Sequence, residues 1–370
     1  MGIKTTKVDS LGEYYDAIAH IGRDIAEKRN LSDIVPVLWF RAESNVKYPL
    51  LPSLYRLNFY SHGTKLDSDE QYTNIHYAED IRTQHYQAKN YHYLSKEPSS
   101  RLEYLEVMQH HGVRARVLDW SESSTHSLLF AMEPFYCEKA IGFNNRDERN
   151  PCVWVLDPYV LNKKLFEKLL NKDCLLKNLI KELGMNSADV KKVIERTKNL
   201  FCERNLEEYY CGKDTKHIDH ILNLAELNNE VFRDRGRLAK LFKYKEAFNP
   251  LFYFLTRIYS DGFLLDDYEL PPLAVVQPYH SERIKAQKGV FTVFPFYKEI
   301  ENQPNDLLLE DGFNPVAMSY NAIASECLHK IVFLRPQSIA REILVNGMNE
   351  SWLYPEMPVA SNEIEKHMVY

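Results

Sequence analysis

Three polar segments, far apart along the chain, carry the side-chain types that bind anions and transfer protons. Arginine binds phosphate and carboxylate groups through paired hydrogen bonds, and histidine exchanges a proton near neutral pH. Together these types predict a cleft that binds an anionic ligand and supports acid–base chemistry. The residues concerned are Arg41 in the first segment, Gln109, His110, Arg116 and Asp119 in the second, and Arg283 and Gln287 in the third.

Arg41 directly follows an apolar run over 35–40, whose length and aromatic content predict a buried strand. An arginine at the end of a buried strand is costly unless it meets an anion. That anion is either the phosphate or carboxylate of a ligand, or the side chain of Asp119 or Glu43 in a structural ion pair. Both interpretations of Arg41 stay open.

The second segment gathers an amide, an imidazole, charged groups and an indole in one short stretch around Gly112, which is suited to end a helix over 101–109. Such a cluster suits nucleotide binding, with Trp120 as a surface on which a base stacks. The alternative is a buried polar network that holds the turn together. His110 is the candidate acid–base group.

Arg283 and Gln287 are four residues apart, so on a helix they face the same way. A strand is predicted directly afterwards, over 290–294. The two side chains are therefore candidates for a third wall of the cleft. The alternative is that Arg283 pairs with neighbours of Glu282 on a solvated helix.

The apolar patterning predicts an α+β fold, with a mixed or antiparallel central sheet and flanking helices. Ser10 and Glu13 form a capping box that opens the first helix. Further strands are predicted over 117–118, 151–156, 273–276, 290–294 and 331–334, and further helices over 68–97, 101–109, 121–132 and 337–345. The predicted organisation is an N-terminal helix over 1–30, a core over 31–160 and 263–370, and a helical insertion or cap over 161–262.

The bulk properties exclude several classes of protein. The 370 residues carry a net charge of −6, which argues against general nucleic-acid binding. The six cysteines form no C-x-x-C pair, which favours a reduced, cytoplasmic compartment. No apolar run is long enough to span a bilayer, so no membrane contact is expected. Neither glycine-rich phosphate-binding motif nor H-E-x-x-H occurs, and no metal is expected.

The ordered motifs resemble the FRG-domain family, named for a Phe-Arg-Gly motif at the end of its first strand. Here that motif reads Phe40-Arg41-Ala42, with alanine in place of glycine. The second hallmark of the family resembles the stretch over 109–121, in which Arg114-Ala115 replaces Pro-Thr. Later family segments resemble 153–158 and 283–291, so the resemblance extends over most of the chain.

A weaker resemblance is to the layout of mono-ADP-ribosyltransferases. It implies that NAD is the substrate, that Arg41 holds its pyrophosphate, and that Ser121 belongs to a serine-rich turn that stiffens the pocket. It also implies a catalytic glutamate, but Gln287 stands at that place, with Glu282 and Glu326 as substitutes. The ligand-binding set is Arg41, Gln109, Arg116, Trp120, Ser121 and Arg283, and the catalytic set is Arg41, His110, Asp119 and Gln287.

Two functions follow as hypotheses. One is an NAD-dependent transferase or glycohydrolase, a toxin or anti-phage effector that modifies a protein or a nucleic acid. The other is a non-catalytic module that binds a nucleotide, another small molecule or nucleic acid. A hydrolase of another kind remains a third alternative.

Overall fold

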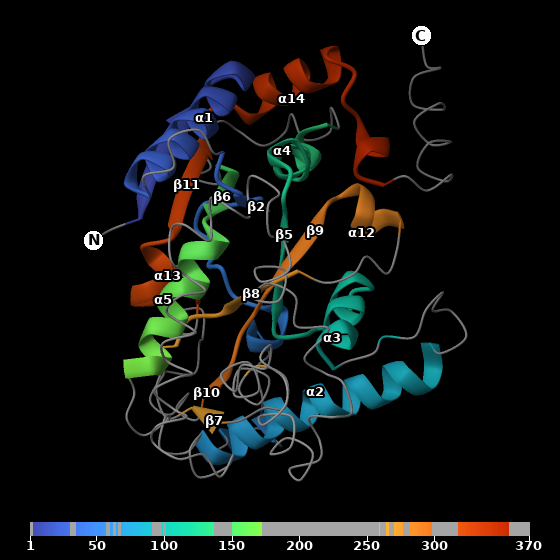
Figure 1. Ribbon diagram of the computed structural model, residues 1–370. Helices are drawn as coiled ribbons and strands as arrows, with labels where there is room; N and C mark the ends of the chain where they lie inside the picture. Colours follow the sequence, from blue (N-terminus) through green and yellow to red (C-terminus); the bar gives the residue numbers. More distant parts are fainter. Residues whose placement is uncertain are drawn as a thin grey trace, which may run out of the picture.

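The computed structural model describes thirteen stretches of the chain: residues 3–29, 35–56, 60–61, 64–65, 68–90, 98, 101–136, 150–171, 259, 264–265, 270–276, 282–297 and 317–354. Helices flank a mixed sheet, as the sequence predicts (Figure 1). The predicted insertion over 161–262 lies outside these residues, apart from 161–171 and Tyr259.

The sheet has seven strands in the order β1-β11-β6-β2-β5-β9-β8. At one edge of the sheet, β1 and β11 run parallel. Every other neighbouring pair in this sheet is antiparallel. The strands are β1 (Lys4–Val8), β2 (Trp39–Glu43), β5 (Val117–Ser121), β6 (Cys152–Leu156), β8 (Leu273–Val275), β9 (Gly289–Val293) and β11 (Leu328–Phe333). Two further pairs of short strands lie outside this sheet. Strand β3 (Tyr60–Ser61) pairs with β4 (Thr64–Lys65), and β7 (Leu264–Leu265) pairs with β10 (Phe296–Tyr297).

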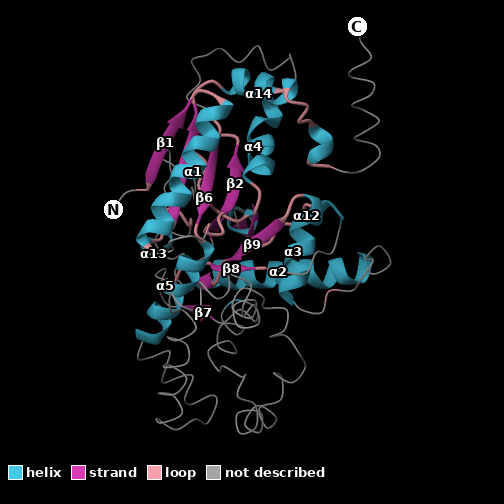
Figure 2. Ribbon diagram, turned by 45° about the horizontal axis from the view of Figure 1, so that its top comes forward, coloured by secondary structure: helices cyan, strands magenta, loops and turns pink. Residues whose placement is uncertain are grey.

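Helices cover both faces of the sheet, and β6 is buried along its whole length as a result (Figure 2). Val153 and Val155 belong to one hydrophobic core, which also contains residues of α1, α4 and α14. Trp154 belongs to the other core, together with residues of α3 and α5. The helices are α1 (Leu11–Lys28), α2 (Ser68–Asn90), α3 (Arg101–His110), α4 (Ser124–Met132), α5 (Pro158–Asn171), α12 (Glu282–Ala286), α13 (Ala322–Ser325) and α14 (Pro336–Val345).

The predicted caps are confirmed. Ser10 is the N-cap of α1 and its hydroxyl accepts a hydrogen bond from the Glu13 backbone N–H at 3.2 Å. The Glu13 carboxylate reaches back to the N–H of Asp9 at 2.7 Å, one residue earlier than a standard capping box. Gly112 follows α3 with a φ of +79°, the left-handed conformation that ends helices.

The predicted end of the first strand was wrong. Residues 35–38 form no ladder, and β2 begins only at Trp39, so Arg41 lies in the middle of the strand. The pairing of Trp39–Glu43 with all five residues of β6 sets these limits, and local apolar content does not reveal it. The helix predicted over 121–132 also begins later than predicted. Helix α4 begins at Ser124, because Ser121 is the last residue of β5 and Ser123 is the N-cap.

None of the described helices is both long enough and apolar enough to cross a bilayer.

Candidate functional site

The central sheet divides between β2 and β5, and a cavity opens at the division. These two strands share one paired position, Phe40 with Ser121, whereas β2 pairs with β6 and β5 with β9 over five positions each. Beyond Phe40 the strands separate, and 41–44 and 119–120 become facing walls of a cavity of about 410 Å³. Cavities that hold small ligands span about 300–1,000 Å³.

The third wall comes from α12 and the turn before β9, and the end of α3 completes the lining. The structure thus brings together parts of all three polar segments. The sequence-predicted residues that line the cavity are Arg41, Gln109, His110, Asp119, Trp120, Ser121, Arg283 and Gln287.

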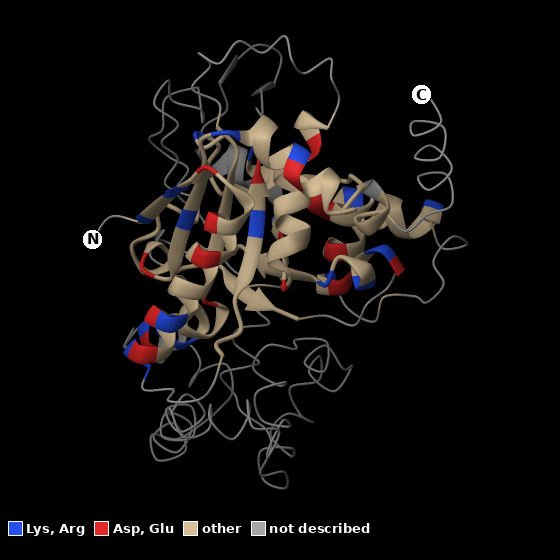
Figure 3. Ribbon diagram, turned by 90° about the horizontal axis from the view of Figure 1, so that it is seen from above, with Lys and Arg blue, Asp and Glu red and all other residues tan. Residues whose placement is uncertain are grey.

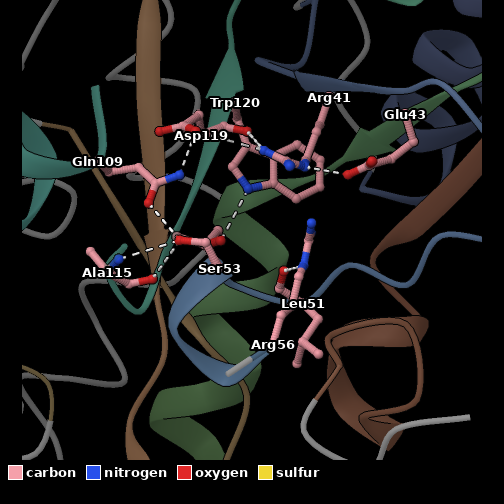
Figure 4. A network of polar contacts seen from close by, with 10 residues as sticks. Arg41, Glu43, Leu51, Ser53, Arg56, Gln109, Ala115, Asp119 and Trp120 are labelled. Carbon is pink, nitrogen blue, oxygen red and sulfur yellow. Dashed lines mark hydrogen bonds and ion pairs between the residues drawn. The ribbon is translucent and has the colours of Figure 1, made fainter. Parts of the chain in front are cut away.

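Two acceptors hold the Arg41 guanidinium in place. Its Nε donates to Glu43 Oε1 at 2.9 Å, and its Nη1 donates to the backbone oxygen of Asp119 at 2.7 Å (Figure 4). The Asp119 carboxylate lies farther off, with Oδ2 at 3.9 Å from Nη1. In the described part of the chain, Nη2 has no protein partner and remains available to a ligand. The predicted ion pair is therefore present, and it orients the arginine without using all its donors.

A chain of side-chain hydrogen bonds fixes Asp119 from the other side. Ser53, in the short helix Ser53–Arg56, donates through its hydroxyl to Gln109 Oε1 at 3.0 Å. The Gln109 amide nitrogen in turn donates to Asp119 Oδ2 at 3.3 Å (Figure 4). Because Gln109 uses both ends of its amide in this way, its main role is to position Asp119. Ser53 was not predicted, and no local sequence pattern connects it to Gln109.

The Asp119 side chain is 47% accessible, and it lies on the wall of the cavity. Its carboxyl group therefore contacts the cavity and not bulk solvent. Its removal from bulk water raises the pKa of the carboxyl, while the Arg41 cation and the Gln109 hydrogen bond act in the opposite direction. A carboxyl with a raised pKa inside a cavity is a common feature of functional sites.

Among the described residues, Arg283 is a cation without an anionic partner. Its guanidinium lies 4.5 Å from the centre of the Tyr354 ring, a cation–π contact. Within the described residues it forms no ion pair, and its Nε is buried without a hydrogen bond. The predicted pairing of Arg283 with neighbours of Glu282 is thus absent from the part of the chain that the structure describes. A partly buried and unpaired arginine on a cavity wall favours an anionic ligand.

Arg283 also contributes to the protonation state of its neighbour His110. Burial, followed by the Arg283 and His111 charges, lowers the pKa of His110 to about 4. The imidazole is therefore neutral at physiological pH and can accept a proton from a bound nucleophile.

This arrangement predicts a measurable titration. In an NMR titration, the pKa of the wild-type His110 imidazole should be about 4. Replacing Arg283 with alanine should raise this pKa toward the ordinary His value, because a repelling positive charge is removed. The rise should be partial, since burial is the larger cause and remains. The Arg283→Lys variant keeps the charge and is the control. A pKa that is the same in wild type and Arg283→Ala would contradict the assigned proximity.

Ser121 and Gln287 join β5 to the turn before β9. The Ser121 hydroxyl donates to the backbone oxygen of Gln287 at 2.6 Å and accepts from the Ser123 N–H at 2.9 Å. The Gln287 side-chain nitrogen donates to the backbone oxygen of Leu353 at 2.8 Å. Ser121 therefore stiffens this corner of the cavity. Gln287 lines the cavity but uses its amide nitrogen to hold the C-terminal segment.

Two predicted ligand-binding residues lie elsewhere or are largely covered. Arg116 is fully buried away from the cavity lining, where its Nε donates to Glu79 at 3.0 Å and its guanidinium lies 4.4 Å from the Phe296 ring centre. It stabilises the fold, so its predicted ligand contact is wrong. Trp120 lines the cavity but is 3% exposed, and its Nε1–H donates to Thr292. Little of its ring is open to stacking.

The glutamates considered as substitutes for a catalytic glutamate do not line the cavity. Glu282 is exposed and pairs with Lys285, and Glu326 is exposed and pairs with Lys164. The carboxylates that do line it are Glu43 and Asp119. Several apolar residues of the lining were not predicted as site residues, because only the folded chain brings them to the cavity: Phe130, Ile284 and Phe291.

Among the described residues, no group of three or more His, Cys, Asp or Glu side chains is placed to hold a metal ion.

Comparison with known proteins links this site to a family. Residues 37–138 match the model of the FRG domain. The chain contains an FRG domain. That domain supplies Arg41, Gln109, His110 and Asp119, whereas α12 and β9 lie beyond the matched residues. Neither the curated proteins nor the solved structures contain a significant match to the chain.

Proposed function

We propose that the cavity between β2 and β5 of this FRG-domain protein binds NAD and that the protein transfers ADP-ribose to an acceptor. The observation that carries the proposal is the pair of arginines on separate walls. Arg41 has an uncommitted Nη2 and Arg283 has no anionic partner in the described chain. Two cations facing one cavity suit a pyrophosphate. The partly exposed ring of Phe130 on the cavity wall suits one of the bases.

The resemblance to the mono-ADP-ribosyltransferase layout supports the same ligand and suggests a role for each group. The bond between nicotinamide and ribose C1′ breaks, and its electron pair leaves with nicotinamide. A carboxylate then stabilises the positive charge that develops on the ribose. Asp119 and Glu43 are the carboxylates on the cavity wall, and Gln287 contributes at most an amide dipole. The acceptor oxygen or nitrogen attacks C1′, and neutral His110 accepts its proton.

Nicotinamide release tests this proposal. The protein is incubated with NAD, with and without cell extract, and free nicotinamide is followed over time beside an Arg41→Ala variant. We expect release by wild type and a loss of about 100-fold or more in the variant, the scale of removing one positioned electrostatic contact. Arg335→Ala is the matched control, because Arg335 is exposed beside Asp9. No release and no labelled acceptor under any condition would contradict the transferase function.

A non-catalytic nucleotide-binding module is the second candidate. Gln287 in place of a glutamate before β9 favours it, because an amide cannot supply the negative charge expected at that place. If NAD or another nucleotide binds in an Arg41-dependent manner and stays intact, this second function is supported and the first is excluded.

We place the protein in the cytoplasm as a toxin or anti-phage effector, on the basis of its cysteine usage and the proposed chemistry. Expression of the wild type should slow bacterial growth, and the Arg41→Ala variant at equal abundance should not. Equal growth of the two strains would argue against a toxic activity.

A further inference from the structure

Beside the His110 and Arg283 wall of the cavity, cations and rings form a chain of neighbours, which we call the rim band. It consists of Arg82, Tyr86, His111, Arg114 and Arg283. It starts on α2, crosses the turn after α3 and reaches α12, and these three helices lie next to one another in two views (Figures 1 and 2). The band therefore leads directly to the Arg283 wall of the cavity.

Contacts between neighbours make the band continuous. Arg82 and Tyr86 are one turn apart on α2, so they share a face. The Tyr86 ring stacks on His111, with ring centres 6.5 Å apart and planes 24° apart. Tyr86 itself is buried, so it supports the exposed His111 ring from beneath. Arg283 lines the same cavity as His110, the neighbour of His111. Burial, followed by the Arg283 charge, lowers the pKa of both imidazoles.

Two arginines of the band, Arg82 and Arg114, lie near each other, and Glu79 is the carboxylate that acts on Arg82. Arg114 is near enough to Arg82 to help lower its pKa, second to the effect of burial. Glu79 opposes this shift, but its carboxylate is engaged by Arg101 and Arg116. In the described residues, Arg82 Nη1 is buried without a hydrogen bond, and neither Arg82 nor Arg114 forms an ion pair. Unpaired like charges at close range are unfavourable unless an anion joins them.

The charge of the whole chain does not account for this band. The chain carries −6 overall, and the face seen in Figure 3 shows basic and acidic residues side by side. A local row of unpaired arginines on an acidic protein therefore indicates a specific ligand. Cations combined with an exposed ring suit a single nucleic-acid strand, in which phosphates alternate with stackable bases.

We infer that the rim band binds single-stranded nucleic acid and presents one of its nucleotides to the cavity. The inference deepens the proposed function by naming the class of acceptor, and it rests on that function only for the transfer step. Arg82 and Arg114 bind successive phosphates, His111 stacks on a base, and Arg283 lies at the junction with the NAD site. The acceptor atom is then a nucleophilic oxygen or nitrogen of the nucleotide that enters beside His110.

Fluorescence anisotropy with a labelled single-stranded oligoribonucleotide, without NAD, tests the band. We expect the wild type to bind more tightly to the single strand than to the corresponding duplex, because only unpaired bases can stack. In the Arg82→Gln/Arg114→Gln variant, affinity should fall about tenfold or more. The slope of log affinity against log salt should decrease by about 1.4, since each lost phosphate contact removes about 0.7. Arg335→Gln should bind like wild type.

Arg114→Gln alone gives a second test, because its side chain is exposed on the turn and its replacement does not threaten folding. Its affinity should fall by less than that of the double variant. Its slope of log affinity against log salt should decrease by about half as much, about 0.7. An affinity equal to that of wild type in the double variant, or no binding by wild type at low salt, would overturn the inference.

Nicotinamide release, measured on the same samples, separates this inference from the proposed function. Strand binding that depends on Arg82 and Arg114, without nicotinamide release by wild type, would support the rim band and refute the transferase. Nicotinamide release without strand binding would refute the rim band alone. The double variant should still bind NAD, because neither arginine lines the cavity.

Discussion

Replacing Glu79 with alanine is expected to lower the free energy of unfolding by about 3–5 kcal/mol, the cost of leaving a buried charge without its partner. Glu79 and Arg116 are both fully buried and pair at 3.0 Å, and Glu79 also accepts from Arg101 at 3.1 Å. The alanine variant would remove the Glu79 carboxylate from the buried Arg116 cation. Its contact with the Phe296 ring, 4.4 Å from the guanidinium, does not replace that charge.

Denaturant unfolding measures this effect, and three variants separate its causes. Arg116→Ala should destabilise less than Glu79→Ala, because Glu79 keeps Arg101 as a partner. The double replacement Glu79→Leu/Arg116→Met should recover most of the loss, since a well-packed apolar pair often replaces a buried ion pair without cost. Arg335→Ala, which removes an exposed contact with Asp9, should change stability by less than about 1 kcal/mol. A Glu79→Ala protein as stable as wild type would contradict the assigned burial.

Replacing Arg283 with alanine is expected to weaken NAD binding by about 10- to 150-fold. A hydrogen bond to a charged group contributes about 1.5–3 kcal/mol, and each 1.4 kcal/mol corresponds to a factor of ten. The loss should fall on binding and not on folding, because Arg283 has no ion pair within the described residues. Arg283→Lys should recover part of the affinity, because it keeps the charge but not the planar fork.

Isothermal titration calorimetry of each variant with NAD gives the affinities, and thermal unfolding checks the fold. Arg335→Ala should bind NAD like wild type, because Arg335 does not line the cavity. Equal affinities of Arg283→Ala and wild type would show that the ligand does not reach this wall.

Most of the secondary structure was predictable, because apolar spacing and capping residues are local signals. The strand over 152–156 and the helix over 101–110 follow from such signals. Strand β1 (Lys4–Val8) was missed because four of its five residues are exposed, so no apolar alternation marks it. It exists through its parallel pairing with β11, which is a tertiary interaction.

The candidate site was predicted in composition but not in detail. The spacing of four residues predicted that Arg283 and Gln287 face the same way, and both line the cavity. It could not distinguish Arg41, whose donors partly face the cavity, from Arg116, which is fully buried. That difference depends on Glu79, which is distant in sequence and which only folding brings to Arg116. Nor could spacing reveal the division between β2 and β5, because a single paired position defines it.

The most direct test of the nucleotide site is hydrogen exchange followed by mass spectrometry, with and without NAD. Slower exchange is expected in three separate segments when NAD is present: β2 with the residues up to Ser44, β5, and the stretch from α12 into β9. These segments line one cavity through residues that include Arg41, Asp119 and Arg283. The Arg41→Ala/Arg283→Ala variant should lose this protection. Protection that is absent from these three segments, or confined to others, would contradict the assignment of the cavity as the NAD site.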